Sequence, residues 1–283
     1  MAKWRKFPYE SVAYEYPGQR LADAWGELHR GDREPFPDPD WVGQQLQAHP
    51  HAAPRNFDGA VAELANSLAE AWRHFHAGRF DSAVQIAEEC GLLGANCANK
   101  STGIYATYLE PDTGQQQVLF QVSIERAGIA VEQLPHLANS HYFHAFNLGR
   151  LSQSMSVMDA LRQGFGGKIL ASLEQAIELE PNHAEAHTAL GMYHAEVINK
   201  VGKMIGAMTY GASADKAREQ FERAIELAPD SPIAHIEYGN GLYLLRGDRE
   251  LDAVTDLYVK AAEMEARDAM ERLDIESARS ELD

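Results

Sequence analysis

Apolar and polar residues follow one another with the 3.6-residue period of amphipathic helices along most of the chain after residue 56. Turn signals rich in glycine, proline and aspartate cut this pattern into successive pairs of helical segments. The predicted helices cover residues 58–76, 80–89, 96–109, 112–134, 138–163, 167–179, 184–208, 213–227, 232–245, 249–265 and 268–282. The pattern therefore predicts an all-α fold of about five helix pairs, closed by a last helix with a polar outer face.

One phrase occurs twice within this pattern. Residues 176–191 read AIELEPNHAEAHTALG, and residues 224–239 read AIELAPDSPIAHIEYG. The shared positions are Pro181, His187 and Gly191 in the first copy and Pro229, His235 and Gly239 in the second, with a fainter copy at Pro135, His141 and Ala145. The prolines are 46 and 48 residues apart, and self-similarity at such a period is typical of repeat arrays.

Residues 1–56 have a different character, because aromatic residues and prolines are frequent in them. One clear helical pattern is formed by Leu21, Trp25 and Leu28. The stretch PFPDPD over residues 35–40 is predicted to be extended, since each proline disfavours helix in the residue before it. Asp40 is predicted to cap the short helix that follows. We interpret this segment as an arm that its aromatic side chains anchor on the repeats, because a disordered tail would carry fewer of them.

With these positions the chain resembles the tetratricopeptide-repeat superfamily. The resemblance rests on Gly78, Phe80, Ala83, Ala176, Pro181, Gly191, Phe221, Ala224, Pro229 and Gly239. Small residues let the two helices of a pair approach closely, large residues fill the space between them, and the proline closes the second helix. The superfamily repeat has about 34 residues. The longer repeats here are similar to those of the regulator-of-microtubule-dynamics proteins, the T-component proteins of TRAP-type solute transporters and some uncharacterised bacterial tetratricopeptide proteins.

The resemblance implies a right-handed superhelical solenoid of tetratricopeptide-like helix pairs over residues 57–267. The arm over residues 1–56 would precede it, and a capping helix over residues 268–283 would close it. For function, the resemblance implies binding of a protein segment or a small ligand in a concave groove, lined by the first helix of each pair. The repeat register also predicts that a large side chain at Gly191 or Gly239 disrupts the packing of helix pairs.

Charge and composition narrow the class of partner. The net charge of −17 argues against nucleic acid, because an acidic surface repels phosphate backbones. The N-terminus lacks the apolar core of a secretory signal, and the chain has no apolar run long enough to span a bilayer. The two cysteines, Cys90 and Cys97, are interpreted as reduced thiols. We therefore expect a cytoplasmic protein, with a homo-oligomer as an open alternative to a monomer.

Candidate partner-binding residues lie on the first helix of several pairs, according to the repeat register. They are Lys100, Asn139, Tyr142, Phe146, Arg150, Thr188, Met192, Asn240 and Tyr243. Aromatic side chains there would anchor a docked peptide or helix, and an arginine would pair with a carboxylate. In some members of the superfamily, lysine and asparagine side chains clamp a partner's terminal carboxylate, and Asn96, Asn99 and Lys100 offer these residue types. The alternative is a solvated lysine beside asparagines that hydrogen-bond locally.

Twelve histidines raise the question of a metal site. The pair His183 and His187 has the i, i+4 spacing that can share a metal ion, but no acidic or cysteine ligand completes the set. His141, His187 and His235 recur with the repeat, at a position where the superfamily has an aromatic residue. We interpret them as packing residues with one nitrogen satisfied, and we assign no metal and no cofactor.

No sequence motif for catalysis is present. The chain has no Gly-x-Ser-x-Gly elbow and no glycine-rich phosphate loop. A stripe of Met204, Met208 and Tyr210 is interpreted as core rather than as a contact with a membrane. The sequence thus predicts a non-catalytic scaffold or adaptor that binds a protein or peptide in its groove. The alternative is a carrier of a small ligand or metal in a cavity between the elongated helices.

Overall fold

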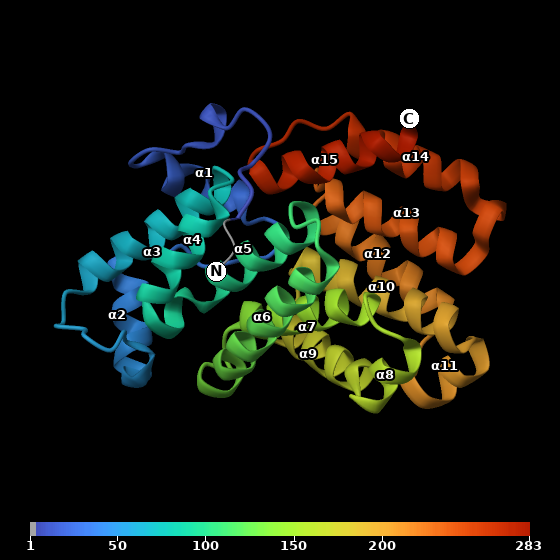
Figure 1. Ribbon diagram of the computed structural model, residues 1–283, viewed down its shortest axis with the longest axis horizontal. Coiled ribbons are helices and arrows are strands. Elements are labelled where there is room, and N and C mark those ends of the chain that lie inside the picture. Colours follow the sequence, from blue (N-terminus) through green and yellow to red (C-terminus); the bar gives the residue numbers. More distant parts are fainter. Residues whose placement is uncertain (1–3) are drawn as a thin grey trace. The chain divides into compact units, whose positions relative to one another are not determined.

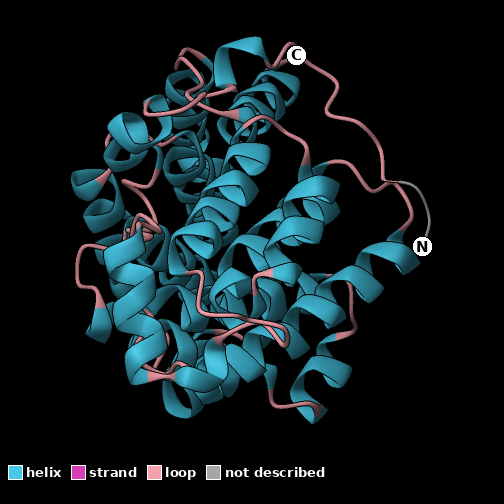
Figure 2. Ribbon diagram, turned by 90° about the vertical axis from the view of Figure 1, so that its left-hand side faces the viewer, coloured by secondary structure: helices cyan, strands magenta, loops and turns pink. Residues whose placement is uncertain are grey.

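The structure is a computed structural model of the chain and describes residues 4–283. Within these residues all regular structure is helical, and no strand is present (Figures 1 and 2). The α-helices are α1 (Arg20–Leu28), α2 (Pro39–Ala48), α3 (Val61–His76), α4 (Phe80–Glu89), α5 (Ala95–Tyr108), α6 (Thr113–Gln133), α7 (Ala138–Gln153), α8 (Val157–Arg162), α9 (Phe165–Leu179), α10 (Ala184–Val201), α11 (Lys203–Tyr210), α12 (Ala214–Leu227), α13 (Pro232–Arg246), α14 (Leu251–Ala262) and α15 (Ala269–Leu282). The predicted all-α class is confirmed.

The chain divides into two compact units. Unit 1 comprises Met1–His29, Glu34–Ser154 and Asp268–Met270, and unit 2 comprises Arg30–Arg33, Met155–Arg267 and Glu271–Asp283. Within unit 1, α3 packs on α4 and α5 packs on α6; within unit 2, α10 packs on α12 and α13 packs on α14. These are four of the five helix pairs that the sequence predicts. The two helices of the remaining predicted pair, over 138–163 and 167–179, are divided between the units, with α7 in unit 1 and α9 in unit 2. The boundary between the units lies inside the segment 57–267, which the sequence analysis treats as one domain.

Two of the predicted long helices are interrupted. The predicted helix over 138–163 stops before Ser156, whose hydroxyl caps the separate helix α8 by accepting a hydrogen bond from the backbone N–H of Asp159 at 3.1 Å. The predicted helix over 184–208 is broken at Gly202, which has a φ of +82°. A left-handed backbone of this kind ends a helix and suits glycine. Each long helix is therefore replaced by a repeat helix and a short extension.

The arm is anchored in unit 1 by aromatic side chains, as the sequence analysis expects. The buried ring of Trp25, on α1, packs edge-on against the rings of Trp72 and His76 on α3. At the start of the arm, the ring of Trp4 stacks on Tyr105 with 4.0 Å between centroids. Aromatic pairs in these arrangements stabilise contacts beyond the area that they bury. Apart from residues 30–33, which belong to unit 2, the arm is therefore an integral part of unit 1.

The predicted cap of the second arm helix is wrong by two residues. Asp38, and not Asp40, accepts a hydrogen bond from the backbone N–H of Trp41 at 2.7 Å. Pro39 explains the difference, because proline is favoured at the first helical position and so moves the N-cap to the residue before it.

The recurring histidines are buried packing residues, as predicted. The Nε2 atoms of His141 and His187 hydrogen-bond to the carbonyl oxygens of Pro135 and Pro181, at 2.9 and 3.1 Å. His235 hydrogen-bonds through Nδ1 to the N-cap carbonyl of α13 at 3.0 Å. At His141 and His187 the repeated phrase therefore produces a local bond between the proline turn and the helix that follows it, whereas His235 bonds to Ser231 instead.

The methionine stripe on α11 is not core, so that interpretation is wrong. Met204 is 74% exposed and Met208 is 83% exposed. The helix packs inward through Gly206, and its short length leaves the opposite face to solvent. The Tyr210 ring lies close to Gly166, so that the extension contacts the start of α9. None of the helices in the described part of the chain combines the length and the apolar character needed to cross a bilayer.

Candidate functional site

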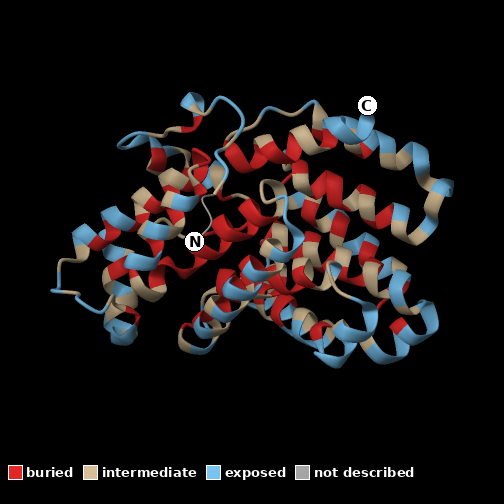
Figure 3. Cartoon of the chain, viewed as in Figure 1, coloured by how far each residue is buried: buried red, intermediate tan, exposed pale blue. Residues whose placement is uncertain are grey.

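The helix α5 lies in the interior of unit 1. Every residue from Ala95 to Ala106 is buried, and Figure 3 shows the helix buried along nearly its whole length. Asn96, Asn99 and Lys100 are among these residues. Their polar groups need partners inside the protein, because burying a polar or charged group without one is costly. They are also the residues that the sequence analysis relates to a carboxylate clamp.

A carboxylate from the arm reaches this helix. Asn139 Nδ2, in the first turn of α7, donates a hydrogen bond to Glu34 Oε2 at 2.6 Å. Asn96 Nδ2 donates to the same oxygen at 3.3 Å and lies 3.5 Å from the other. Trp25 Nε1 donates to the backbone carbonyl of Glu34 at 2.7 Å and fixes the segment. The arm thus presents a glutamate, only 6% exposed, to the first helices of two successive pairs.

Lys100 places a positive charge in the same region and is 3% exposed. Its ammonium lies 5.7 and 5.9 Å from the ring centroids of Phe75 and Phe143, within the range of cation–π attraction. Burial raises the pKa of the Cys97 thiol well above its usual range, and the charge of Glu34 raises it further, whereas Lys100 lowers it. Both charges therefore act on one buried thiol, and this thiol is protonated at neutral pH.

Asn99 lies apart from this cluster. Its Oδ1 accepts a hydrogen bond from Nη1 of Arg126 on α6 at 3.1 Å, and Arg126 also pairs with Glu88 on α4. Of the three residues related to a clamp, the structure therefore brings Asn96 together with Asn139 at Glu34, keeps Lys100 buried one turn further along α5, and places Asn99 in a contact with α6.

Three of the predicted binding residues lie next to one another along α7. Tyr142, Phe146 and Arg150 follow at i, i+4 spacing, which places them on one helix face. The ring centroids of Tyr142 and Phe146 are 6.2 Å apart, and the Arg150 guanidinium lies 5.5 Å from the Phe146 centroid. The use of these three residues in binding stays a prediction.

The four predicted residues of unit 2 lie on α10 and α13, which pack on each other. Thr188 is buried, and its hydroxyl donates to a backbone carbonyl of the preceding turn at 3.0 Å. Asn240 Oδ1 accepts a hydrogen bond from the Tyr258 hydroxyl at 2.6 Å. Met192 is partly buried, and Tyr243 is 51% exposed. The polar pair is thus engaged locally, whereas Met192 and Tyr243 offer apolar surface.

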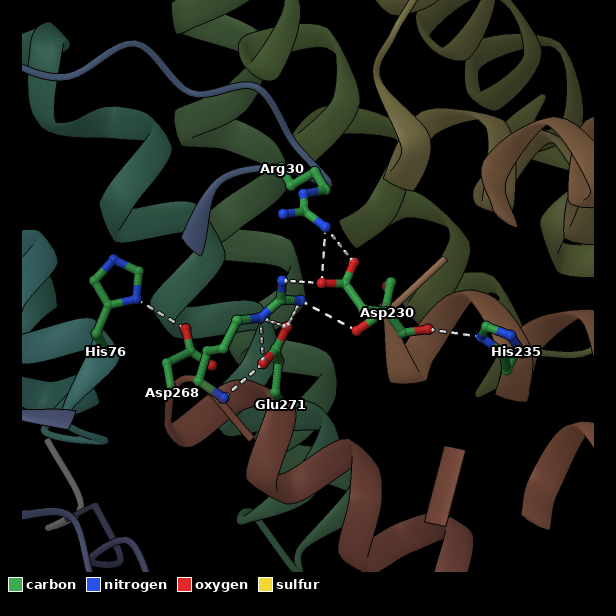
Figure 4. A network of polar contacts seen from close by, with 8 residues as sticks. Arg30, His76, Asp230, His235, Asp268 and Glu271 are labelled. Atoms are coloured by element: carbon green, nitrogen blue, oxygen red, sulfur yellow. Dashed lines mark hydrogen bonds and ion pairs between the residues drawn. The ribbon is translucent and has the colours of Figure 1, made fainter. Parts of the chain in front are cut away.

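Residues 30–33 of the arm belong to unit 2 and lie at the beginning of its repeat helices. The Gly31 carbonyl accepts a hydrogen bond from the backbone N–H of Glu185, in the first turn of α10, at 2.9 Å. Arg30 Nη1 donates to both carboxylate oxygens of Asp230 at 2.7 and 2.8 Å, and Arg267 Nη1 donates to the same carboxylate at 2.7 Å. Figure 4 shows the Arg30 guanidinium directed at the Asp230 carboxylate.

Other candidate sites are less developed. A small pocket between α12 and α13 is lined by Ala214, Asp215, Arg218, Phe221, Tyr238, Leu242, Leu245 and Arg246, none of which is a predicted groove residue. Within residues 4–283, no group of three or more His, Cys, Asp or Glu side chains is arranged to hold a metal ion. The His183 ring accepts a hydrogen bond from the backbone N–H of Ala186 at 3.1 Å. This bond caps α10 and gives His183 a structural role.

The chain matches a known protein family. Residues 98–272 match the family described as Regulator of microtubule dynamics protein 1-3, and this range covers more than half of the chain. The chain belongs to that family. The resemblance of the long repeats to this family, as predicted from the sequence, is confirmed. No curated protein sequence matches the chain.

The fold of this family member is also found in a solved structure. The crystal structure of TTC0263, a thermophilic TPR protein in Thermus thermophilus, matches with a TM-score of 0.54 and 18% sequence identity. The match covers 77% of this chain and 99% of that one. At this identity the likeness concerns the fold alone, and it confirms the predicted tetratricopeptide-like helix pairs.

The sequence does not predict that Glu34 contacts α5 and α7. It predicts an extended stretch over residues 35–40 and an arm anchored on the repeats. It does not reveal which side chain of the arm enters the interior. The indication that α5 needs a polar partner lies in the chemistry of its side chains. The segment ANCANK, over residues 95–100, combines two asparagines and a lysine in a helix that is buried on all sides. Such a helix requires a polar partner from elsewhere in the chain.

The buried histidine His194 on α10 gives a prediction about acid stability. Burial, with a smaller effect of Lys216, lowers its pKa from 6.5 to about 4. Between these values the unfolded chain binds a proton that the folded chain does not, so stability is complete above about pH 6.5 and is lost as the pH falls toward 4. We expect the free energy of unfolding to fall less between pH 7.5 and pH 4.5 in His194→Gln than in the wild type, by about 2 kcal/mol. Urea unfolding of both proteins at the two pH values measures this difference. Equal losses in both proteins would contradict this assignment.

Proposed function

We propose that this protein is a non-catalytic scaffold that binds an extended protein segment on the first helices of its repeats. One observation supports the proposal most directly. The extended arm segment at Glu34 is held on α5 and α7 by the side chains of Asn96 and Asn139. This contact is of the kind that a partner segment would make, because side-chain amides fix an extended chain at a defined position. A tetratricopeptide-like repeat fold agrees with the proposal.

The face proposed for a partner in unit 2 lies on α10 and α13. Met192 and Tyr243 lie on it, and Tyr243 is half exposed, as an aromatic anchor for a partner has to be. In unit 1 the equivalent face is occupied by the arm. We propose no second function, because no specific observation favours a carrier of small ligands or metals.

Selection from a library of peptides displayed on phage tests the proposal on the full chain. Selected peptides should bind the wild type and lose about tenfold or more of their affinity for Tyr243→Ala, since exposed aromatic anchors contribute strongly to binding. Leu251→Ala is the matched control, because Leu251 is an exposed apolar residue on α14, the second helix of the same pair. Failure to select any peptide, or equal affinity for wild type and Tyr243→Ala, would reject the proposal.

A further inference from the structure

The contact between the arm and α5 has the chemistry of a ligand in its binding pocket. We propose that Asn96, Lys100 and Asn139 form a carboxylate-binding pocket and that the arm is its built-in occupant through Glu34. An acidic segment of a partner protein would then compete with the arm. This inference rests on the proposed function, since it assigns the chemistry of the bound segment and a means of regulating access to it.

The groups around the Glu34 carboxylate favour a negative charge. Asn139 and Asn96 both direct amide N–H groups at it, and an ionised carboxylate only accepts hydrogen bonds. Lys100 adds a buried positive charge in the same interior. A glutamine in place of the glutamate would bring one amide group of its own toward these donors and would remove the charge. The pocket should therefore distinguish Glu from Gln in any segment that enters it.

The arm also specifies the backbone around the glutamate. Pro35 fixes an extended chain directly after Glu34, and Phe36 follows with its ring edge-on to Trp25, 5.0 Å between centroids. Arg33, just before, has a φ of +54°, a left-handed conformation that is strained for arginine. The occupant is thus a Glu-Pro-aromatic segment that enters from a strained residue. A competing partner segment should carry the same three residue types.

A tethered occupant competes strongly with one in solution. Because the arm belongs to the same chain, its effective concentration at the pocket is on the order of millimolar. A partner segment therefore binds only when the arm is weakened, and this is autoinhibition. Removal of the Glu34 carboxylate should weaken the arm without altering the donors of the pocket.

The test uses the full chain and a fluorescent peptide with the sequence of residues 30–41, RGDREPFPDPDW. Fluorescence anisotropy should show that Glu34→Ala and Glu34→Gln bind this peptide about tenfold or more tightly than the wild type does. The same peptide with Gln in place of its Glu should not bind. Glu27→Ala is the matched control, because Glu27 is an exposed glutamate of the same arm, and it should behave as the wild type. Adding Asn139→Ala to Glu34→Gln should abolish the gain.

Cys97 provides a second measurement that does not depend on the peptide. In a Cys90→Ala background it is the remaining thiol of the chain, and it is buried next to the pocket on α5. Its rate of labelling by a thiol reagent should rise about tenfold or more in Glu34→Gln, since local opening governs the reactivity of a buried group. The Glu peptide should reduce this rate, and the Gln peptide should leave it unchanged. Circular dichroism establishes that each variant is folded.

The outcomes separate this inference from the proposed function. Equal binding of the Glu and Gln peptides, or no gain in Glu34→Gln with unchanged Cys97 labelling, would overturn the carboxylate pocket. If phage-selected peptides still bind through Tyr243 in that case, the proposed function stands without it. If neither kind of peptide binds to any variant, both are rejected.

Discussion

Asp268→Ala is expected to lower the free energy of unfolding by about 3 kcal/mol, because it leaves a buried imidazole without its hydrogen-bond partner. In unit 1, Nδ1 of His76 lies 2.8 Å from Oδ2 of Asp268, and both side chains are almost completely buried (Figure 4). The His76 ring is surrounded by the rings of Trp25, Trp72 and Tyr16. None of these rings replaces a lost carboxylate, so the imidazole N–H would remain buried without its acceptor.

Urea unfolding of the wild type and three variants measures this effect. Asp268→Asn keeps an oxygen acceptor and should cost about 1 kcal/mol. Glu226→Ala is the control, because it removes an exposed ion pair with Arg223, and such pairs contribute at most about 1 kcal/mol. A loss in Asp268→Ala no larger than in Glu226→Ala would show that the His76 contact contributes little to unit 1.

The repeat helices could be predicted because their signals are local. The helix α4 spans Phe80–Glu89, the predicted range, since a glycine turn precedes it and its apolar residues follow one period. The buried histidines could be predicted from their recurrence in the repeated phrase. The break at Gly202 could not, because an isolated glycine within a helical pattern is compatible with continuation as well as with a stop.

The candidate site could be predicted only in part. The residue types of the proposed pocket are visible in the sequence, and the resemblance relates those on α5, but not Asn139 on α7, to carboxylates. Their partner, Glu34, is 62 residues from Asn96 and 105 from Asn139 along the chain. No periodic pattern reports a contact over such a separation. The exposure of Met204 and Met208 could not be predicted for a related reason, since an apolar stripe does not reveal whether another helix lies against it.

Gly191→Leu is expected to destabilise unit 2 by about 3 kcal/mol or more, because overpacking a tight core forces neighbouring side chains out of their rotamers. A Cβ atom at Gly191 would lie 2.8 Å from two carbons of the ring of Phe221, a buried residue of α12. At Gly239 the nearest atom, on the Tyr258 ring, is 3.1 Å away, so Gly239→Leu should have the smaller effect.

Gly149→Leu is the matched control for both variants. It lies within α7, where a Cβ atom would meet nothing within 4 Å, and leucine favours helix more than glycine does. Thermal unfolding followed by circular dichroism should therefore give the lowest melting temperature for Gly191→Leu and the next lowest for Gly239→Leu. The melting temperature of Gly149→Leu should be equal to that of the wild type or higher. Unchanged melting in both Gly191→Leu and Gly239→Leu would contradict the repeat register, because this register requires a small residue where the two helices of a pair approach most closely.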